Sequence, residues 1–147
     1  MRRARAAALL IVQPDLVESY LAHRAAQGMN IDHKVRWGAR ALLAEVPDLE
    51  NFSRLPLERQ LAFNHETHRF ISWLAVTGRM QPGADYLVAR RPRLGVVLAR
   101  TEPELHLRFM ETARSLGFRD TVAMTQFNLL GHFVALFGRR PDELQQT

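Results

Sequence analysis

Phe63–Leu87, with the sequence FNHETHRFISWLAVTGRMQPGADYL, is the stretch that decides the fold. Its apolar residues recur every three or four positions, which is the period of an amphipathic helix. We expect this helix to run from Leu57 to Thr77, because Pro56 suits a first helical turn and Gly78 suits a helix end. Its inner face is expected to hold Phe63, Thr67, Phe70, Ile71 and Leu74. The stretch therefore predicts a largely buried helix that ends at a glycine and is followed by a proline–glycine turn.

The same helical period continues on both sides of this stretch. We expect further helices from Leu16 to Gly28, from Asn30 or Asp32 to Val46, around Tyr86 to Ala89, from Thr101 to Leu116 and from Asp120 or Thr121 to Phe137. No segment shows a convincing strand-like alternation of polar and apolar residues. The sequence therefore predicts an all-α fold, a bundle of five to seven helices that form one unit or two small helical subdomains.

The segments between and within these helices have predicted roles as well. Asp48–Leu55 is expected to form a short turn of helix or a loop, and Gly78–Arg100 a basic connector rich in glycine and proline. Thr101 has a capping-box pattern with Glu104. The helix from Asp120 carries so few polar residues that we expect it to be the most buried one. The core is expected to include the stripe Leu105, Phe109, Ala113 and Leu116 and the aromatic residues Phe63, Phe70, Phe127, Phe133 and Phe137.

Along the chain, these patterns divide the sequence into three parts. Residues 1–13 are expected to form a basic N-terminal arm, residues 14–91 a first helical subdomain, and residues 92–147 a second one. The turn signal and the start of a new element at Asp142–Leu144 lead us to expect a further domain beyond this chain.

Composition limits the kind of function. The chain has 147 residues and no cysteine, which excludes disulfides, thiolate metal sites and cysteine nucleophiles and is compatible with a reducing cytoplasm. No apolar run approaches the roughly 18 residues of a bilayer-spanning helix, so we expect a cytoplasmic protein without a membrane partner. The net charge of +5 favours a polyanionic partner such as nucleic acid.

The second helix carries the most informative surface. Arg36, Trp37 and Arg40, with Lys34 at their flank, lie opposite the apolar face of this helix. Arginine binds guanine and phosphate, and a tryptophan ring packs on sugar and backbone, so this face suits a DNA groove. The alternative is a solvated basic face, with Trp37 packed against a neighbouring helix.

A second basic set lies in the connector, where Arg90, Arg91 and Arg93 surround Pro92. These side chains suit contacts to backbone phosphates, each of which steepens the salt dependence of binding by about 0.9 in a log–log plot. The alternative is a solvated loop without a partner.

The sequence contains no complete motif for catalysis or for a metal site. His65, Glu66 and His68 place two histidines three positions apart, whereas zinc peptidases need a spacing of four. No Ser/His/Asp order and no glycine-rich phosphate loop is evident. We therefore expect no metal and no cofactor.

Three stretches together resemble one known family. Leu16–Leu21, followed by Arg24, Gly28 and a basic helix, resembles the first two helices of the core-binding (SAM-like) domain of tyrosine recombinases, the phage-integrase-like proteins. Phe70–Leu87 resembles the closing helix and exit turn of that domain. Arg114–Gly117, with the segment from Phe137 to Leu144, resembles a second such opening.

The resemblance implies a helical clamp on duplex DNA, used in recombination or integration, with other recombinase subunits as further partners. In that family a separate C-terminal domain supplies the catalytic arginine, histidine and tyrosine residues. The only tyrosines here, Tyr20 and Tyr86, fall in segments that resemble the DNA-binding region, so this chain alone is not expected to cleave DNA. The alternative function is a helical protein–protein interaction module whose basic surface meets an acidic partner.

Overall fold

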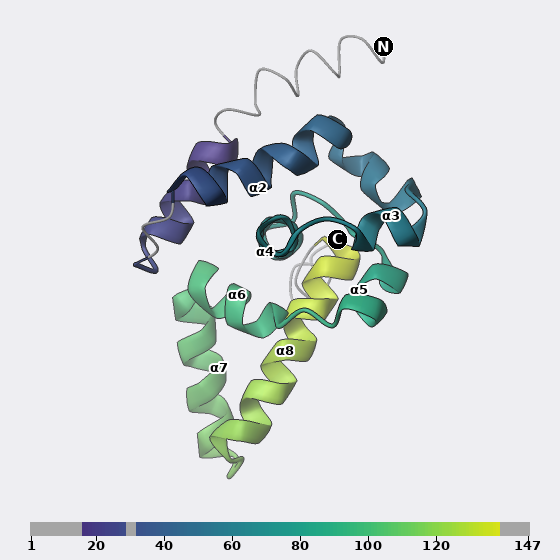
Figure 1. The fold of residues 1–147 in the computed structure, drawn as a ribbon. Coiled ribbons are helices and arrows are strands. Elements are labelled where there is room, and N and C mark those ends of the chain that lie inside the picture. Colours follow the sequence, from purple (N-terminus) through teal and green to yellow (C-terminus); the bar gives the residue numbers. More distant parts are fainter. Residues whose placement is uncertain (1–15, 29–31, 139–147) are drawn as a thin grey trace. The chain divides into compact units, whose positions relative to one another are not determined.

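The structure is a computed structural model that describes residues 16–28 and 32–138. Within these ranges the regular secondary structure consists of helices, without a strand, so the all-α prediction is confirmed (Figure 1). None of the described helices combines the length and the hydropathy that a membrane span requires. The predicted N-terminal arm and the predicted element at Asp142–Leu144 lie outside the described residues.

The chain separates into two compact units, Met1–Ile71 and Ser72–Thr147. The division falls inside helix α4 (His65–Val76), whereas the sequence pattern placed a change of subdomain between residues 91 and 92. Each unit has its own buried residues, and each is described separately below.

Unit 1 consists of a helix at residues 16–25, α2 (Asp32–Glu45), the 3-10 helix η1 (Leu49–Arg54), α3 (Leu57–Leu61) and the first part of α4. The predicted limits of the second helix and the short helical turn after Asp48 are confirmed, whereas the first helix gives way to a turn at residues 26–28, before the predicted end at Gly28. The most deeply buried side chains of this unit are Tyr20, Ala39, Leu42, Phe52, Phe70 and Ile71. The rings of Tyr20 and Phe70 lie 4.8 Å apart and join the first helix to α4.

The prediction of one helix from Leu57 to Thr77 is wrong, because the structure has α3 and α4 with a break between them. Asn64 precedes α4, and its side-chain oxygen accepts a hydrogen bond of 2.9 Å from the Thr67 backbone N–H. This is the geometry of an N-cap, which starts a new helix and satisfies a donor that would otherwise lack a partner.

Unit 2 contains the rest of α4, followed by α5 (Ala84–Arg90), α6 (Leu94–Thr101), α7 (Pro103–Ser115) and α8 (Asp120–Phe137). Helices α7 and α8 form a hairpin, and α6 packs against both (Figure 1). The connector predicted for Gly78–Arg100 is therefore wrong in its second half, because that half forms α6. Leu94 and Leu98 are fully buried in this unit, and their burial stabilises a helix that Gly95 disfavours locally.

The predicted capping role of Thr101 is also wrong. Thr101 is the last residue of α6, and its hydroxyl donates to the carbonyl oxygens of Val97 and Leu98. Helix α7 begins after Glu102, which makes no side-chain capping bond, and has Pro103 in its first turn as predicted.

Helix α8 buries only one of its faces, contrary to the prediction that it is the most buried helix. Ala123, Phe127 and Ala135 are fully buried, but Leu129 is 65% exposed and Phe137 is 54% exposed. Leu116, predicted as part of the core stripe of α7, is 69% exposed in the turn between the two helices. An apolar composition does not by itself bury a helix, and the neighbours of α8 within its unit cover only its inner face.

Candidate nucleic-acid interface

Helix α2 is anchored to α4 through a close contact at Gly38. The Thr67 hydroxyl donates a hydrogen bond of 2.6 Å to the Gly38 carbonyl oxygen. A Cβ atom at Gly38 would lie 2.7 Å from the Glu66 Cβ, so only glycine allows this approach. The contact fixes which face of α2 turns toward the core of unit 1 and which turns outward.

The outward face of α2 presents the residues expected to bind DNA. Lys34, Trp37 and Arg40 are exposed, together with His33. The Trp37 side chain is 62% exposed, so the alternative in which it packs against a neighbouring helix is wrong. Between Asp32 and the final residue of the helix, α2 contains no acidic residue. This face therefore combines two cations with a large exposed ring.

Arg36, the fourth residue of the predicted set on α2, lies at the flank of this face. Its guanidinium forms an ion pair of 2.7 Å with Glu18 of the first helix, and its side chain is 28% exposed. A partly exposed ion pair of this kind contributes little to stability. It does offset the charge of Arg36, so Lys34 and Arg40 are the stronger candidates for phosphate contacts.

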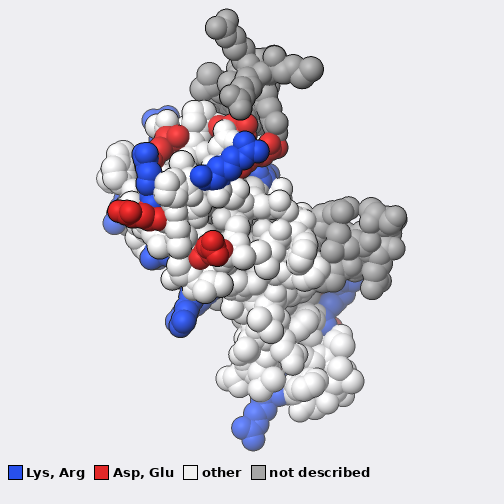
Figure 2. Space-filling view, turned by 90° about the vertical axis from the view of Figure 1, so that its right-hand side faces the viewer, with Lys and Arg blue, Asp and Glu red and all other residues white. Residues whose placement is uncertain are grey.

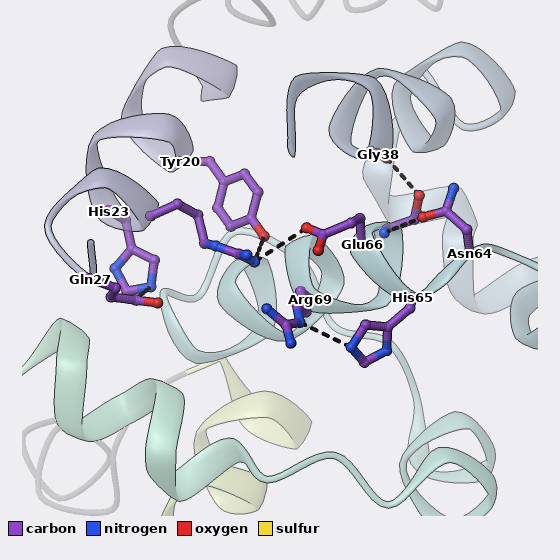
Figure 3. Close-up of polar contacts among 10 residues, drawn as sticks. Tyr20, His23, Gln27, Gly38, Asn64, His65, Glu66 and Arg69 are labelled. Carbon is purple, nitrogen blue, oxygen red and sulfur yellow. Dashed lines mark hydrogen bonds and ion pairs between the residues drawn. The ribbon is translucent and has the colours of Figure 1, made fainter. Parts of the chain in front are cut away.

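A buried polar cluster, which the sequence did not reveal, holds the first helix against α4 (Figure 3). Arg24 forms an ion pair of 3.4 Å with Glu66, and both side chains are nearly inaccessible. The Arg24 Nη1 also donates a hydrogen bond of 3.1 Å to the Tyr20 hydroxyl. Burial raises the pKa of Tyr20, and the neighbouring Arg24 cation opposes that rise. The only sequence signal was the spacing of four between Tyr20 and Arg24, which places both on one helix face.

The histidines considered for a metal site have separate partners. His65 accepts a hydrogen bond of 3.1 Å from the Arg69 Nε, as Figure 3 shows, whereas Glu66 faces Arg24. The His68 Nε2 lies 3.4 Å from the Leu61 carbonyl oxygen in a buried position. Among the residues that the structure describes, no group of three or more histidine, aspartate or glutamate side chains is placed to hold a metal ion.

The connector arginines of unit 2 occupy the turn between α5 and α6. Arg90, Arg91 and Arg93 are all exposed. Arg91 has a φ of 49°, and among the described residues it is the one non-glycine residue with a positive φ. A left-handed conformation is strained for a residue with a side chain, and strain of this kind is often found at functional sites.

Two side chains from α8 hold the far end of this turn. The Asn128 side-chain oxygen accepts a hydrogen bond of 2.8 Å from the Gly95 backbone N–H. The His132 Nε2 lies 3.2 Å from the Pro92 carbonyl oxygen. Neither contact can be predicted from the sequence, because each joins residues more than 30 positions apart and leaves no local pattern. They give the arginine turn a fixed backbone within unit 2.

The described residues include histidine, arginine and tyrosine, the residue types of the recombinase catalytic set. His33 and Arg36 have the His-x-x-Arg spacing that this set contains, but Arg36 is paired with Glu18. Tyr20 and Tyr86 are each only 1% exposed. Both tyrosine side chains are therefore packed inside the units that contain them.

Comparison with known proteins does not assign the chain to a family. No protein-family model, no curated protein and no solved structure matches the chain significantly.

Proposed function

We propose that this chain binds duplex DNA, as the helical clamp region of a tyrosine-recombinase-like protein. The outward face of α2 makes the main contacts, through Lys34, Trp37 and Arg40. The arginine turn between α5 and α6 makes further contacts to backbone phosphates.

The observation that carries this proposal is the chemistry of the outward face of α2. It presents two exposed cations beside a tryptophan that is 62% exposed, without an acidic residue among them. A single exposed ring is common on protein surfaces, so the weight of this observation lies in the two cations beside it. Cations bind phosphates, and aromatic rings pack on sugars and bases, so nucleic acid satisfies both groups at once.

The recombinase part of the proposal depends on the resemblance of the sequence segments alone. In this role the chain positions DNA, and the chemistry of strand cleavage belongs to another domain.

Fluorescence anisotropy with a labelled DNA duplex over a series of salt concentrations tests the proposal. We expect affinity to fall steeply with salt, with a log–log slope of about −0.9 for each phosphate contacted. The variant Arg40→Glu should lower affinity by roughly tenfold or more and make the slope shallower. Affinity that ignores salt, or no binding even at low salt, contradicts the proposal.

Arg54→Glu is the matched control for Arg40→Glu. Arg54 is also exposed in unit 1, and the substitution makes the same change of charge. Equal losses from both variants would show a response to net charge alone and would remove α2 from the interface. Trp37→Ala separates the ring from the charges, because it should lower affinity and leave the salt slope unchanged.

Arg91→Gly tests the arginine turn. Glycine tolerates the positive φ at this position, so the variant should be more stable by about 0.5–1 kcal/mol. It also removes one cation, so its affinity for DNA should fall. A stabilised variant with unchanged affinity would exclude Arg91 from the interface.

The alternative function is a protein-interaction module whose basic surface meets an acidic partner. The exposed Trp37 supports this alternative as strongly as it supports DNA binding, because tryptophan and arginine are also enriched at protein interfaces. Competition with polyglutamate distinguishes the two functions. An acidic polypeptide that displaces DNA only at a large excess of charge favours nucleic acid as the partner, and displacement at equal charge favours the alternative.

A further inference from the structure

Helix α8 carries a second apolar stripe on the face opposite its buried side. Val122 is 42% exposed, Leu129 65%, Leu136 39% and Phe137 54%, and the half-buried Phe133 lies among them. At 3.6 residues per turn these five positions fall within an arc of about 100°. We call them the outer stripe of α8. The buried residues Phe127, Gly131 and Val134 lie on the other side of the helix.

The outer stripe is unusual for a surface of this chain because it has no charge. The whole chain has a net charge of +5, yet α8 contains no Asp, Glu, Lys or Arg after its first residue, Asp120. On the one face that Figure 2 shows, most of the surface at the bottom, where the α7–α8 hairpin lies, is uncharged. A helix that is apolar on all sides is normally covered on all sides. Two copies of a basic protein approach most easily through a neutral surface, where like charges do not repel.

The spacing of the stripe makes it complementary to itself. Val122 and Leu136 lie seven positions on either side of Leu129, near the middle of the helix. If two copies of α8 pack antiparallel about Leu129, Val122 of each copy lies level with Leu136 of the other. Such a two-fold arrangement uses one surface twice, which is the commonest form of protein dimer. Antiparallel packing also aligns the two helix dipoles favourably.

The exposed area is sufficient for such a contact. Aromatic side chains have surfaces of about 150–250 Å² and aliphatic ones somewhat less, so the exposed fractions of the five side chains amount to roughly 400 Å² per copy. With the exposed Thr125 and Gln126 between them, two copies would bury on the order of 1,000 Å², which is about the minimum for a biological interface and fits a weak, reversible dimer. We propose that the outer stripe of α8 is the interface of a symmetric dimer, in which α8 packs antiparallel against α8 of a second copy of this chain. This inference is independent of DNA binding.

Sedimentation equilibrium of the full chain over a range of concentrations tests the dimer. The wild-type protein should sediment as a dimer that dissociates on dilution, with micromolar affinity. Leu129→Glu places two carboxylates at the two-fold axis and should raise the dissociation constant by about 100-fold. Leu107→Glu is the matched control, because Leu107 is 56% exposed on α7, outside the stripe, and should leave the dimer intact. A wild-type protein that stays monomeric at every concentration, or a dimer that Leu129→Glu does not weaken, would overturn the proposal.

Cysteine cross-linking provides a second test that does not rely on disrupting the protein. The chain has no cysteine, so Leu129→Cys introduces the only thiol. At a two-fold axis this thiol faces its own copy, and oxidation or a short bismaleimide should give covalent dimers in high yield. Leu107→Cys should give few. Equal yields from the two variants, or no cross-linking of Leu129→Cys, would contradict the antiparallel arrangement, while circular dichroism confirms that both variants are folded.

Discussion

Helices α2 and α8 each pack against a neighbour through a glycine, but α2 presents a charged face to solvent and α8 an apolar one. Each crosses a neighbour through a glycine, Gly38 against Glu66 of α4 and Gly131 against Leu94 of α6. The outward face of α2 then presents cations and a tryptophan, whereas that of α8 presents aliphatic and aromatic side chains. The buried faces account for the fold of each unit. The outward faces differ, and this difference underlies two separate proposals, one for nucleic acid and one for a second copy.

The largest expected effect comes from comparing the two faces of α8 directly. The Phe127 ring is fully buried and lies 5.1 Å from that of Phe109, so Phe127→Ala should destabilise the protein by about 3–5 kcal/mol. The Phe137 ring is 54% exposed, and Phe137→Ala should cost less than about 1 kcal/mol. Urea denaturation at low protein concentration measures both without a contribution from association. Equal costs would mean that α8 does not have an inner and an outer face.

The next largest loss of stability is expected from alanine substitutions at the two glycines where helices cross, Gly38 and Gly131. A Cβ atom at position 131 would lie 2.8 Å from the carbonyl carbon of Leu94, and one at position 38 would lie 2.7 Å from the Glu66 Cβ. The clash costs about 1–3 kcal/mol, and the better helix propensity of alanine returns about 1 kcal/mol. Gly131→Ala and Gly38→Ala should therefore each be destabilised by up to about 2 kcal/mol in the same urea experiment. Thr125→Ala on the exposed side of α8 is the control and should change stability by less than about 0.5 kcal/mol.

A smaller loss of stability is expected from removing either of two asparagine side chains that accept hydrogen bonds at the starts of helices. Asn64 caps α4 from the preceding residue, and Asn128 of α8 accepts a hydrogen bond from the start of α6. Each alanine variant should lose about 1 kcal/mol of stability. Asn64→Ser should recover most of its loss, because a serine hydroxyl also accepts the Thr67 N–H. If serine and alanine behave alike at position 64, the cap does not explain the break between α3 and α4.

The smallest effect is expected at acid pH, at the start of α8. The hydrogen bond from Arg114 holds the pKa of Asp120 below its ordinary value of 3.8. This carboxylate therefore stabilises the folded state above that value, and the contribution is lost as the pH falls through the lowered pKa. Both side chains are exposed, so the contribution is small. The melting temperature of the wild type should fall slightly more than that of Asp120→Asn on acidification from about pH 6 to about pH 2. Identical falls would show that the ion pair contributes nothing in solution.

Local signals allowed part of the fold to be predicted. The limits of α2 and the end of α7 near Leu116 depend on residues within one or two turns, and the structure agrees with them. The break at Asn64 was missed because asparagine is tolerated inside a helix, and only its bond to the Thr67 N–H makes it a cap. Helix α6 was missed because Gly95 reads as a connector residue. In the structure a Cβ atom there would lie 2.7 Å from the Asn128 Cα, so the glycine is what allows α6 to approach α8.

The sequence by itself determined that the chain is helical and that the two sides of α2 differ. Periodicity states which residues share a face of a helix, and a charged face opposite an apolar one leaves a single way to bury it. Only the tertiary structure decided that Arg36 turns toward Glu18, that Arg24 and Glu66 are buried together, and that half of α8 is left uncovered. These features depend on how closely another helix approaches. The distance between two packed helices is set by contacts between residues far apart in the chain, and no local sequence pattern predicts these contacts.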